Sequence, residues 1–239
     1  MLLLIAAAFG CAQNPRDIPI ARGTCFRTED TIRMDGSDDE WAWSRAEVLS
    51  LVENNGPGAN QIPPLKTYVR TLWNENYLYV FFFCEDHHIR VDYRRRDDPL
   101  WDAKEGLELV EVILMPKQGA GRYYEINVNP AGVVLDVAVN VERGIPRFDP
   151  AWDALGMSVA TARRSTGVDH FDGWTVELAI PWRSVGCSRP DVGVQLRANF
   201  HRGEADLAMP HLSWSPTVRA SFHVPKRFGV LTLGENLSE

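Results

Sequence analysis

The chain has 239 residues, and its 25 Lys and Arg against 32 Asp and Glu give a net charge of −7 at pH 7. Nucleic acid is not a predicted partner, because phosphate backbones are bound by clustered cations and the basic tracts here are short and flanked by acids. With 45% hydrophobic and 24% charged residues, the composition is that of a folded globular protein rather than a disordered or collagen-like chain.

The amino terminus carries an apolar run that ends at Cys11. The run is too short to cross a bilayer, which takes about 20 residues, and we interpret residues 1–11 as a secretory signal. Ala8-Phe9-Gly10-Cys11 resembles a bacterial lipobox, in which the cysteine is lipidated. We therefore expect an exported protein, periplasmic or at the cell surface, that touches the membrane only through a lipid on Cys11.

Three cysteines remain after this segment. Cys84 ends an apolar stretch and is expected to be a buried thiol. Cys25 and Cys187 could form a disulfide in an oxidising compartment, but spacing alone does not establish the pairing.

The rest of the chain shows short β-branched or aromatic runs separated by turn residues, which is typical of a sandwich or barrel. Val133, Leu135, Val137 and Val139 recur at every second position, so they are expected on one face of a strand. Only residues 181–185 look helical, over about one turn. Residues 12–31 are interpreted as an N-terminal extension and residues 32–239 as a single all-β domain, an antiparallel β-sandwich with jelly-roll or immunoglobulin-like layers and little helix. The predicted strands are 66–73, 77–84, 107–115, 123–128, 133–139, 157–162, 174–180, 194–199 and 228–233.

The eight tryptophans divide by their surroundings. Trp101 and Trp214 stand in polar connections that contain proline, where an indole face is available to stack on the apolar face of a sugar ring. Trp152 is a weaker third candidate. Four others are expected to pack in the core: Trp41, Trp73, Trp174 and Trp182.

Several segments, in order, resemble the family 9 carbohydrate-binding modules, a group of β-sandwich modules related to DOMON-type folds. The first is Asp35-Gly36-Ser37-Asp38-Asp39-Glu40-Trp41, which is similar to the opening motif of that family. The later segments are Leu72-Trp73-Asn74, Tyr77-Leu78-Tyr79-Val80, Asp97-Asp98-Pro99-Leu100-Trp101, Val110-Glu111-Val112, Glu125-Ile126-Asn127, Trp174-Thr175-Val176-Glu177 and Lys226-Arg227-Phe228-Gly229.

The resemblance implies non-catalytic binding of sugar ends or oligosaccharides between two indole rings, in support of carbohydrate breakdown. Carried onto this chain, the rings are Trp101 and Trp214. The polar partners are Glu111, Asn199 and Arg202. Structural calcium occurs in some members of the family. The hard oxygen ligands that calcium prefers are offered here by Asp35, Asp38, Asp39 and Asp86.

Two other functions stay open. A glycoside-active enzyme, or an accessory domain of one, would need paired carboxylates, but Glu108 and Glu111 lie three apart on a predicted strand and so point to opposite faces. A DOMON-like haem binder would use Met115, Met209 or a histidine as axial ligand. The adjacent His87 and His88 could ligate a metal only singly, because neighbouring residues on a strand diverge.

Overall fold

The computed structural model describes residues 17–102, 108–117, 119, 121–167, 170–187, 190–207 and 211–236. The predicted targeting segment and Cys11 lie outside these residues, as does Met209. None of the helices among the described residues is long and apolar enough to cross a membrane.

The regular structure of the described residues is mostly β-strand, with one short α-helix and three turns of 3₁₀ helix. The helix is α1 (Trp41–Arg45), and the 3₁₀ turns are η1 (Gly56–Gly58), η2 (Leu100–Asp102) and η3 (Pro225–Arg227). The strands are β1 (Arg22–Arg27), β2 (Leu49–Ser50), β3 (Val52–Glu53), β4 (Thr67–Trp73), β5 (Tyr77–Glu85), β6 (Leu109–Met115), β7 (Arg122–Val128), β8 (Val134–Glu142), β9 (Ile145–Asp149), β10 (Ser158–Gly167), β11 (His170–Pro181), β12 (Gln195–Gly203), β13 (His211–Ser213) and β14 (Gly229–Asn236).

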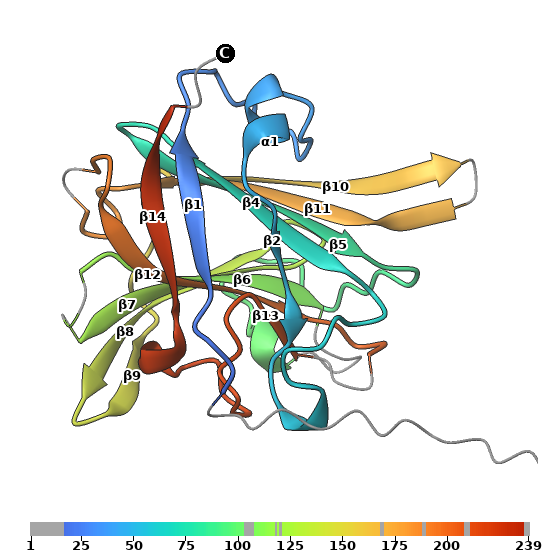
Figure 1. Ribbon diagram of the computed structural model, residues 1–239. Helices are drawn as coiled ribbons and strands as arrows, with labels where there is room; N and C mark the ends of the chain where they lie inside the picture. The colour runs from blue at the N-terminus through green and yellow to red at the C-terminus, as the bar shows by residue number, and fades with distance from the viewer. Residues whose placement is uncertain are drawn as a thin grey trace, which may run out of the picture.

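The strands form a β-sandwich whose two layers belong to one continuous mixed sheet. The strand order is β10-β11-β5-β4-β1-β14-β12-β6-β7-β8-β9. Figure 1 shows β10, β11, β5 and β4 in one layer, β12, β6, β7, β8 and β9 in the other, and β1 and β14 joining them at one side. The pairing is antiparallel except around β1, which runs parallel to both β14 and β4.

The main core lies between the layers. Leu78, Val80 and Phe82 alternate along β5 and face Val110 and Val112 of β6, and all five are buried. The predicted hairpin of residues 66–84 is therefore confirmed as β4 and β5, and the other predicted strands each fall on an observed one. Trp73, Trp174 and Trp182 are buried in this core, as expected.

Each layer also has a smaller core on its outer face. Val133, Leu135, Val137 and Val139 do share one face, and that face packs under Phe228 rather than between the layers. On the other layer, α1 covers residues of β4 and β5 with Trp43. A sandwich layer that is covered on both faces is shielded from solvent on both sides. The sequences of its strands are therefore nearly continuous apolar runs.

Three expectations are wrong, and the open question of a disulfide between Cys25 and Cys187 is answered. Pro181 ends β11, and residues 182–186 form turns rather than a helix, since the Trp182 backbone N–H donates to the Asn76 carbonyl and ties the segment to the β4–β5 turn. Trp41 is 56% exposed, and Trp43, two residues later, takes the buried place. The sandwich begins at β1, inside the segment that we interpreted as an extension. No disulfide joins Cys25 to Cys187.

Candidate functional site

A row of polar side chains crosses the outer face of the second layer. In the register of β7, β6, β12 and β13, Asn127 lies opposite Glu111, Glu111 opposite His201, and His201 opposite Ser213. Glu125 is two residues from Asn127 and so lies on the same face of β7. All five residues are buried, although this face points away from the main core.

Aromatic residues from loops and edge elements cover this polar row and leave a cavity of about 320 Å³. Glu111 lies in its wall. Trp101 of η2 and Phe148 of β9 stand at its mouth, 45% and 47% exposed, with ring centroids 6.2 Å apart. The cavity is lined by Trp101, Leu109, Glu111, Phe148, His211, Ala220, Ser221, Phe222 and His223.

The rings are held in place by contacts with one another. Phe222 stacks on His201 at 3.9 Å between centroids, and His211 meets Phe222 edge-on at 5.3 Å. Phe148 meets His223 edge-on at 4.8 Å. Edge-on and stacked pairs of this kind add about 0.5–1.5 kcal/mol beyond burial, so the lining is a preformed surface.

Glu125 fixes the orientation of the exposed indole. Its Oε1 accepts hydrogen bonds from Trp101 Nε1 at 3.1 Å and from Asn127 Nδ2 at 2.8 Å. Burial raises the pKa of Glu125 to about 7. Burial and the neighbouring Glu125 together raise the pKa of Glu111 well above its ordinary value.

Hydrogen bonding sets the tautomer of His201. Asn54 Nδ2 donates to the Arg219 carbonyl, so Asn54 Oδ1 is the acceptor that Ser213 Oγ reaches at 2.7 Å. The single hydroxyl proton of Ser213 is therefore donated to Asn54, and Ser213 Oγ accepts a hydrogen bond from His201 Nδ1 at 2.6 Å. Burial lowers the pKa of His201 well below its ordinary value, which leaves Nε2 of the neutral ring without a proton.

Five buried polar atoms in and behind the cavity wall have no hydrogen-bond partner among the described residues: Glu111 Oε1, Glu125 Oε2, Asn127 Oδ1, His201 Nε2 and His211 Nδ1. The nearest contacts are too long to be hydrogen bonds, at 3.8 Å from His201 Nε2 to Glu111 Oε1 and 3.7 Å from His223 Nε2 to Glu125 Oε2. Buried polar groups are normally paired. A concentration of unpaired ones beside a cavity marks a place where a ligand supplies the partners.

Only two of the five residues assigned to the sugar site from sequence belong to this cavity. Trp101 and Glu111 line it. Trp214 is 6% exposed and lies in the main core against Phe200, at 5.6 Å between ring centroids. The expected pair of facing indoles is therefore wrong, because the proline-containing connection folds Trp214 inward over β1 and β14.

Asn199 and Arg202 have structural roles instead. Asn199 is buried, and its amide exchanges two hydrogen bonds with Ser215, donating to the carbonyl at 2.8 Å and accepting from the N–H at 2.9 Å. Arg202 is next to His201 on β12, so it points to the opposite face, into the sandwich. There it pairs with Asp86, Glu108 and Glu204.

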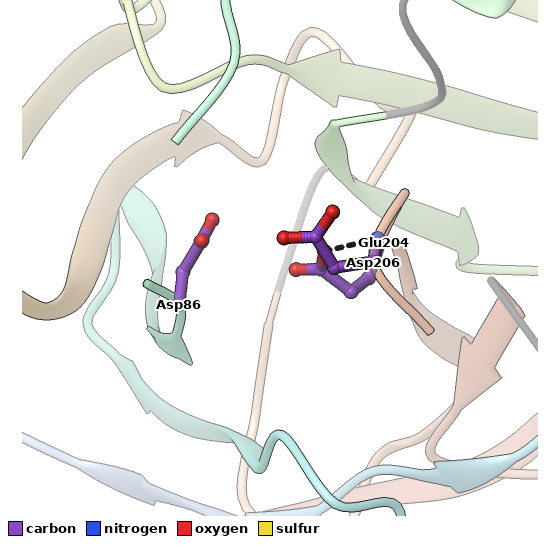
Figure 2. A group of neighbouring side chains, drawn as sticks. All are labelled: Asp86, Glu204 and Asp206. Atoms are coloured by element: carbon purple, nitrogen blue, oxygen red, sulfur yellow. Dashed lines mark hydrogen bonds between the residues drawn. The ribbon is translucent and has the colours of Figure 1, made fainter. Parts of the chain in front are cut away.

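Among the described residues, acidic side chains come together at two places, and each place already holds an arginine. Asp86, Glu204 and Asp206 lie side by side at the ends of β5 and β12 (Figure 2). Arg202 Nη2 lies 3.4 Å from Asp86 and also pairs with Glu204, while Arg90 pairs with Asp206 at 2.5 Å.

The second group is Asp97, Asp136 and Asp153, and Arg96 reaches all three carboxylates. In both places a guanidinium stands where a cation would bind.

The predicted calcium ligands do not form an oxygen cage either. Asp38 pairs with Arg70 and Arg164, and Asp35 and Asp39 both pair with Arg33. Asp86 belongs to the Arg202 group. The donor set proposed from sequence is therefore taken up by ion pairs, and it does not fit calcium.

Sequence reasoning missed most of the lining: Phe148, His211, Phe222 and His223, with Glu125, Asn127 and His201 behind them. A signal was present for Glu125 and Asn127. Both are polar residues at alternate positions of the otherwise apolar segment 123–128, where an unexplained polar group is informative, whereas β12 around His201 is polar at several positions. No comparable pattern marks Phe148 or Phe222.

The chain matches the family of carbohydrate family 9 binding domain-like proteins over residues 34–236. It belongs to this family. No curated protein matches the sequence significantly.

Solved structures share the fold. A Bacteroides uniformis protein assigned as carbohydrate-binding matches with a TM-score of 0.66 and 20% identity, over 89% of this chain and 99% of that one. A family 9 module from Caldicellulosiruptor kristjanssonii in complex with cellotriose matches with a TM-score of 0.62 and 17% identity, over 91% and 95%. A module from the same organism in complex with glucose gives 0.60 and 16%, over 90% and 98%.

Proposed function

We propose that this protein is a non-catalytic carbohydrate-binding domain that holds the end of a glycan in the cavity beside Trp101. The observation that carries the proposal is the set of unpaired acceptors behind a cavity whose mouth is formed by the exposed rings of Trp101 and Phe148. A sugar ring offers the complement of such a surface, with apolar C–H faces for the rings and hydroxyl donors for the acceptors. The volume lies at the low end of ligand pockets, which span about 300–1,000 Å³, and this favours one end of a glycan over a long segment.

The arrangement of the carboxylates supports binding rather than hydrolysis. A glycosidase needs two carboxyl groups that flank the scissile bond. Glu111 and Glu125 lie on adjacent strands and on the same face of the sheet, so both approach the cavity from one side. Glu125 is also held by two N–H donors on one oxygen, which suits an orienting role.

Calorimetric titration against glucose, cello-oligosaccharides and other mono- and oligosaccharides tests the proposal. The Trp101→Ala and Phe148→Ala variants should each weaken binding by tenfold or more, which corresponds to about 1.4 kcal/mol. Trp41→Ala is the matched control, because Trp41 is also an exposed tryptophan but lies on α1, which covers the outer face of the other layer. Equal affinities in all three variants and the wild type, or no binding to any sugar, would refute the proposal.

We further propose that the domain is exported and held at the cell surface or in the periplasm by a lipid on Cys11, where it concentrates glycan for enzymes of carbohydrate breakdown. The support is the apolar run followed by the lipobox-like Ala8-Phe9-Gly10-Cys11. Cell fractionation of the wild type and of Cys11→Ala tests this. The wild type should be in the membrane fraction and the variant released, and a wild type found in the cytosol would contradict the proposal.

A further inference from the structure

The buried acids of the cavity differ from the other buried acids that the structure describes. Asp86, Glu108 and Glu204 share Arg202, and Asp136 pairs with Arg96 at 2.5 Å. Glu177 accepts from two backbone N–H groups and from Trp43 Nε1.

Glu111 and Glu125 have no arginine or lysine partner among the described residues. The basic groups found within 4 Å of their carboxyl oxygens are the rings of His201 and His223, at 3.8 and 3.7 Å. Burial lowers the pKa of His201 far below neutrality and that of His223 to about 4, so both rings are uncharged at pH 7. A pair of buried carboxylates without a cation is costly unless a proton or a positive ligand compensates it.

The unpaired atoms also favour a positively charged ligand. Asn127 Nδ2 donates to Glu125, which turns Asn127 Oδ1 toward the unpaired set as an acceptor. His201 Nε2 is an acceptor for the reason given above. Glu111 Oε1 and Glu125 Oε2 add two further acceptors when both carboxyl groups are ionised, and His211 Nδ1, which is also unpaired, belongs to a ring that can donate or accept. Each hydroxyl of a neutral sugar brings an acceptor with its donor, whereas an ammonium brings three donors and no acceptor.

The rest of the lining suits a cation as well. In the part of the chain that the structure describes, neither Lys nor Arg lines the cavity. The faces and edges there belong to Trp101, Phe148 and Phe222, and a cation placed over an aromatic face within about 6 Å of its centroid is attracted by about 0.5–2 kcal/mol. Anionic sugars would meet Glu111 with no counter-charge.

We infer that the sugar selected by this cavity carries a free ammonium group, as a hexosamine residue does, and that Glu111, backed by Glu125, receives that group. The inference rests on the proposed function, and it names the ligand class within it. It predicts a preference for a free amine over both a hydroxyl and an acetamide at the same ring position.

Titration calorimetry of the wild-type protein at pH 7 compares glucosamine, glucose and N-acetylglucosamine, with their β-1,4-linked oligomers in the same series. Glucosamine is expected to bind at least tenfold more tightly than either of the others. Raised salt should reduce that margin, because part of it is electrostatic. Glu111→Gln keeps the size of the side chain and cannot carry a negative charge, so it should bring the ratio of glucosamine affinity to glucose affinity close to one. Circular dichroism spectra of the wild type and of Glu111→Gln should be the same if the variant is folded.

The possible results separate this inference from the proposed function. Glucose or N-acetylglucosamine binding as tightly as glucosamine, with loss of binding in Trp101→Ala, overturns the inference and leaves the proposed function standing. An undiminished preference in folded Glu111→Gln also overturns it. Absence of binding to every sugar overturns both.

Discussion

The position of Trp214 can be tested through the glycine that it rests on. A Cβ atom added at Gly229 would lie 2.3 Å from Cζ3 of Trp214 and 2.8 Å from two further ring atoms. Ordinary carbon contacts are about 3.5–4.0 Å, so the ring would have to move by more than 1 Å. It has little room, since Gly23 of the neighbouring strand lies against the same ring and Phe200 packs against it as well.

We therefore expect Gly229→Ala to lower the free energy of unfolding by about 1–3 kcal/mol, the usual cost of overpacking a core. For a chain of this length that corresponds to a fall in Tm of about 2–12 °C. Urea denaturation followed by tryptophan fluorescence measures the change. Sugar affinity of the folded protein should stay the same, because Trp214 lies between the layers and not in the cavity.

A second substitution shows whether the indole is the cause. Trp214→Phe removes the outer ring atoms that the new methyl group meets, so Gly229→Ala should cost less in that background. Contacting pairs of this kind show coupling of about 0.5–3 kcal/mol. Independent effects of the two substitutions, or a stable Gly229→Ala protein that has lost sugar affinity, would show that Trp214 faces the ligand and that our placement is wrong.

Two further predictions concern buried charge. Arg202→Leu should destabilise the protein by about 3–5 kcal/mol at pH 7, because it leaves three buried carboxylates without their arginine. In thermal melts the difference from the wild type should become smaller at low pH, where the carboxylates are protonated. A variant as stable as the wild type would contradict the ion-pair assignment. The pKa of Glu125 is raised from 4.5 to about 7 in the folded state, so its ionisation costs stability as the pH rises through that window. Glu125→Gln should then match the wild type near pH 4 and exceed it by up to about 3 kcal/mol at pH 8, and a constant difference in urea midpoints across this range would rule out the shift.

The alternation of apolar and polar residues in the sequence predicted most of the fold. Alternation along residues 133–139 places four aliphatic side chains on one face, and they are found there. The same rule separates Asn199 from Arg202, which are three apart on β12, so the two could not have served one site together. The misplaced helix at 181–185 shows the limit of local signals, because a contact with the β4–β5 turn decides that segment.

The tryptophans show the same limit for the site. Trp101 and Trp214 have similar local surroundings, with proline and polar neighbours. One stands at the mouth of a cavity and the other is enclosed. The difference arises from Gly23 and Gly229, which leave room for an indole on the faces of two strands that are adjacent in space but far apart in the sequence.

The sequence by itself determined that the chain is an all-β member of its family, and which side chains share a face of each strand, because a strand repeats every two residues whatever surrounds it. Only the tertiary structure decided which face becomes a binding surface. That depends on Trp101, Phe148, Phe222 and His223 arriving from distant parts of the chain to cover the row formed by Glu111, Asn127 and His201. Burial of polar groups and enclosure of a cavity are properties of such long-range contacts, which leave no period in the sequence.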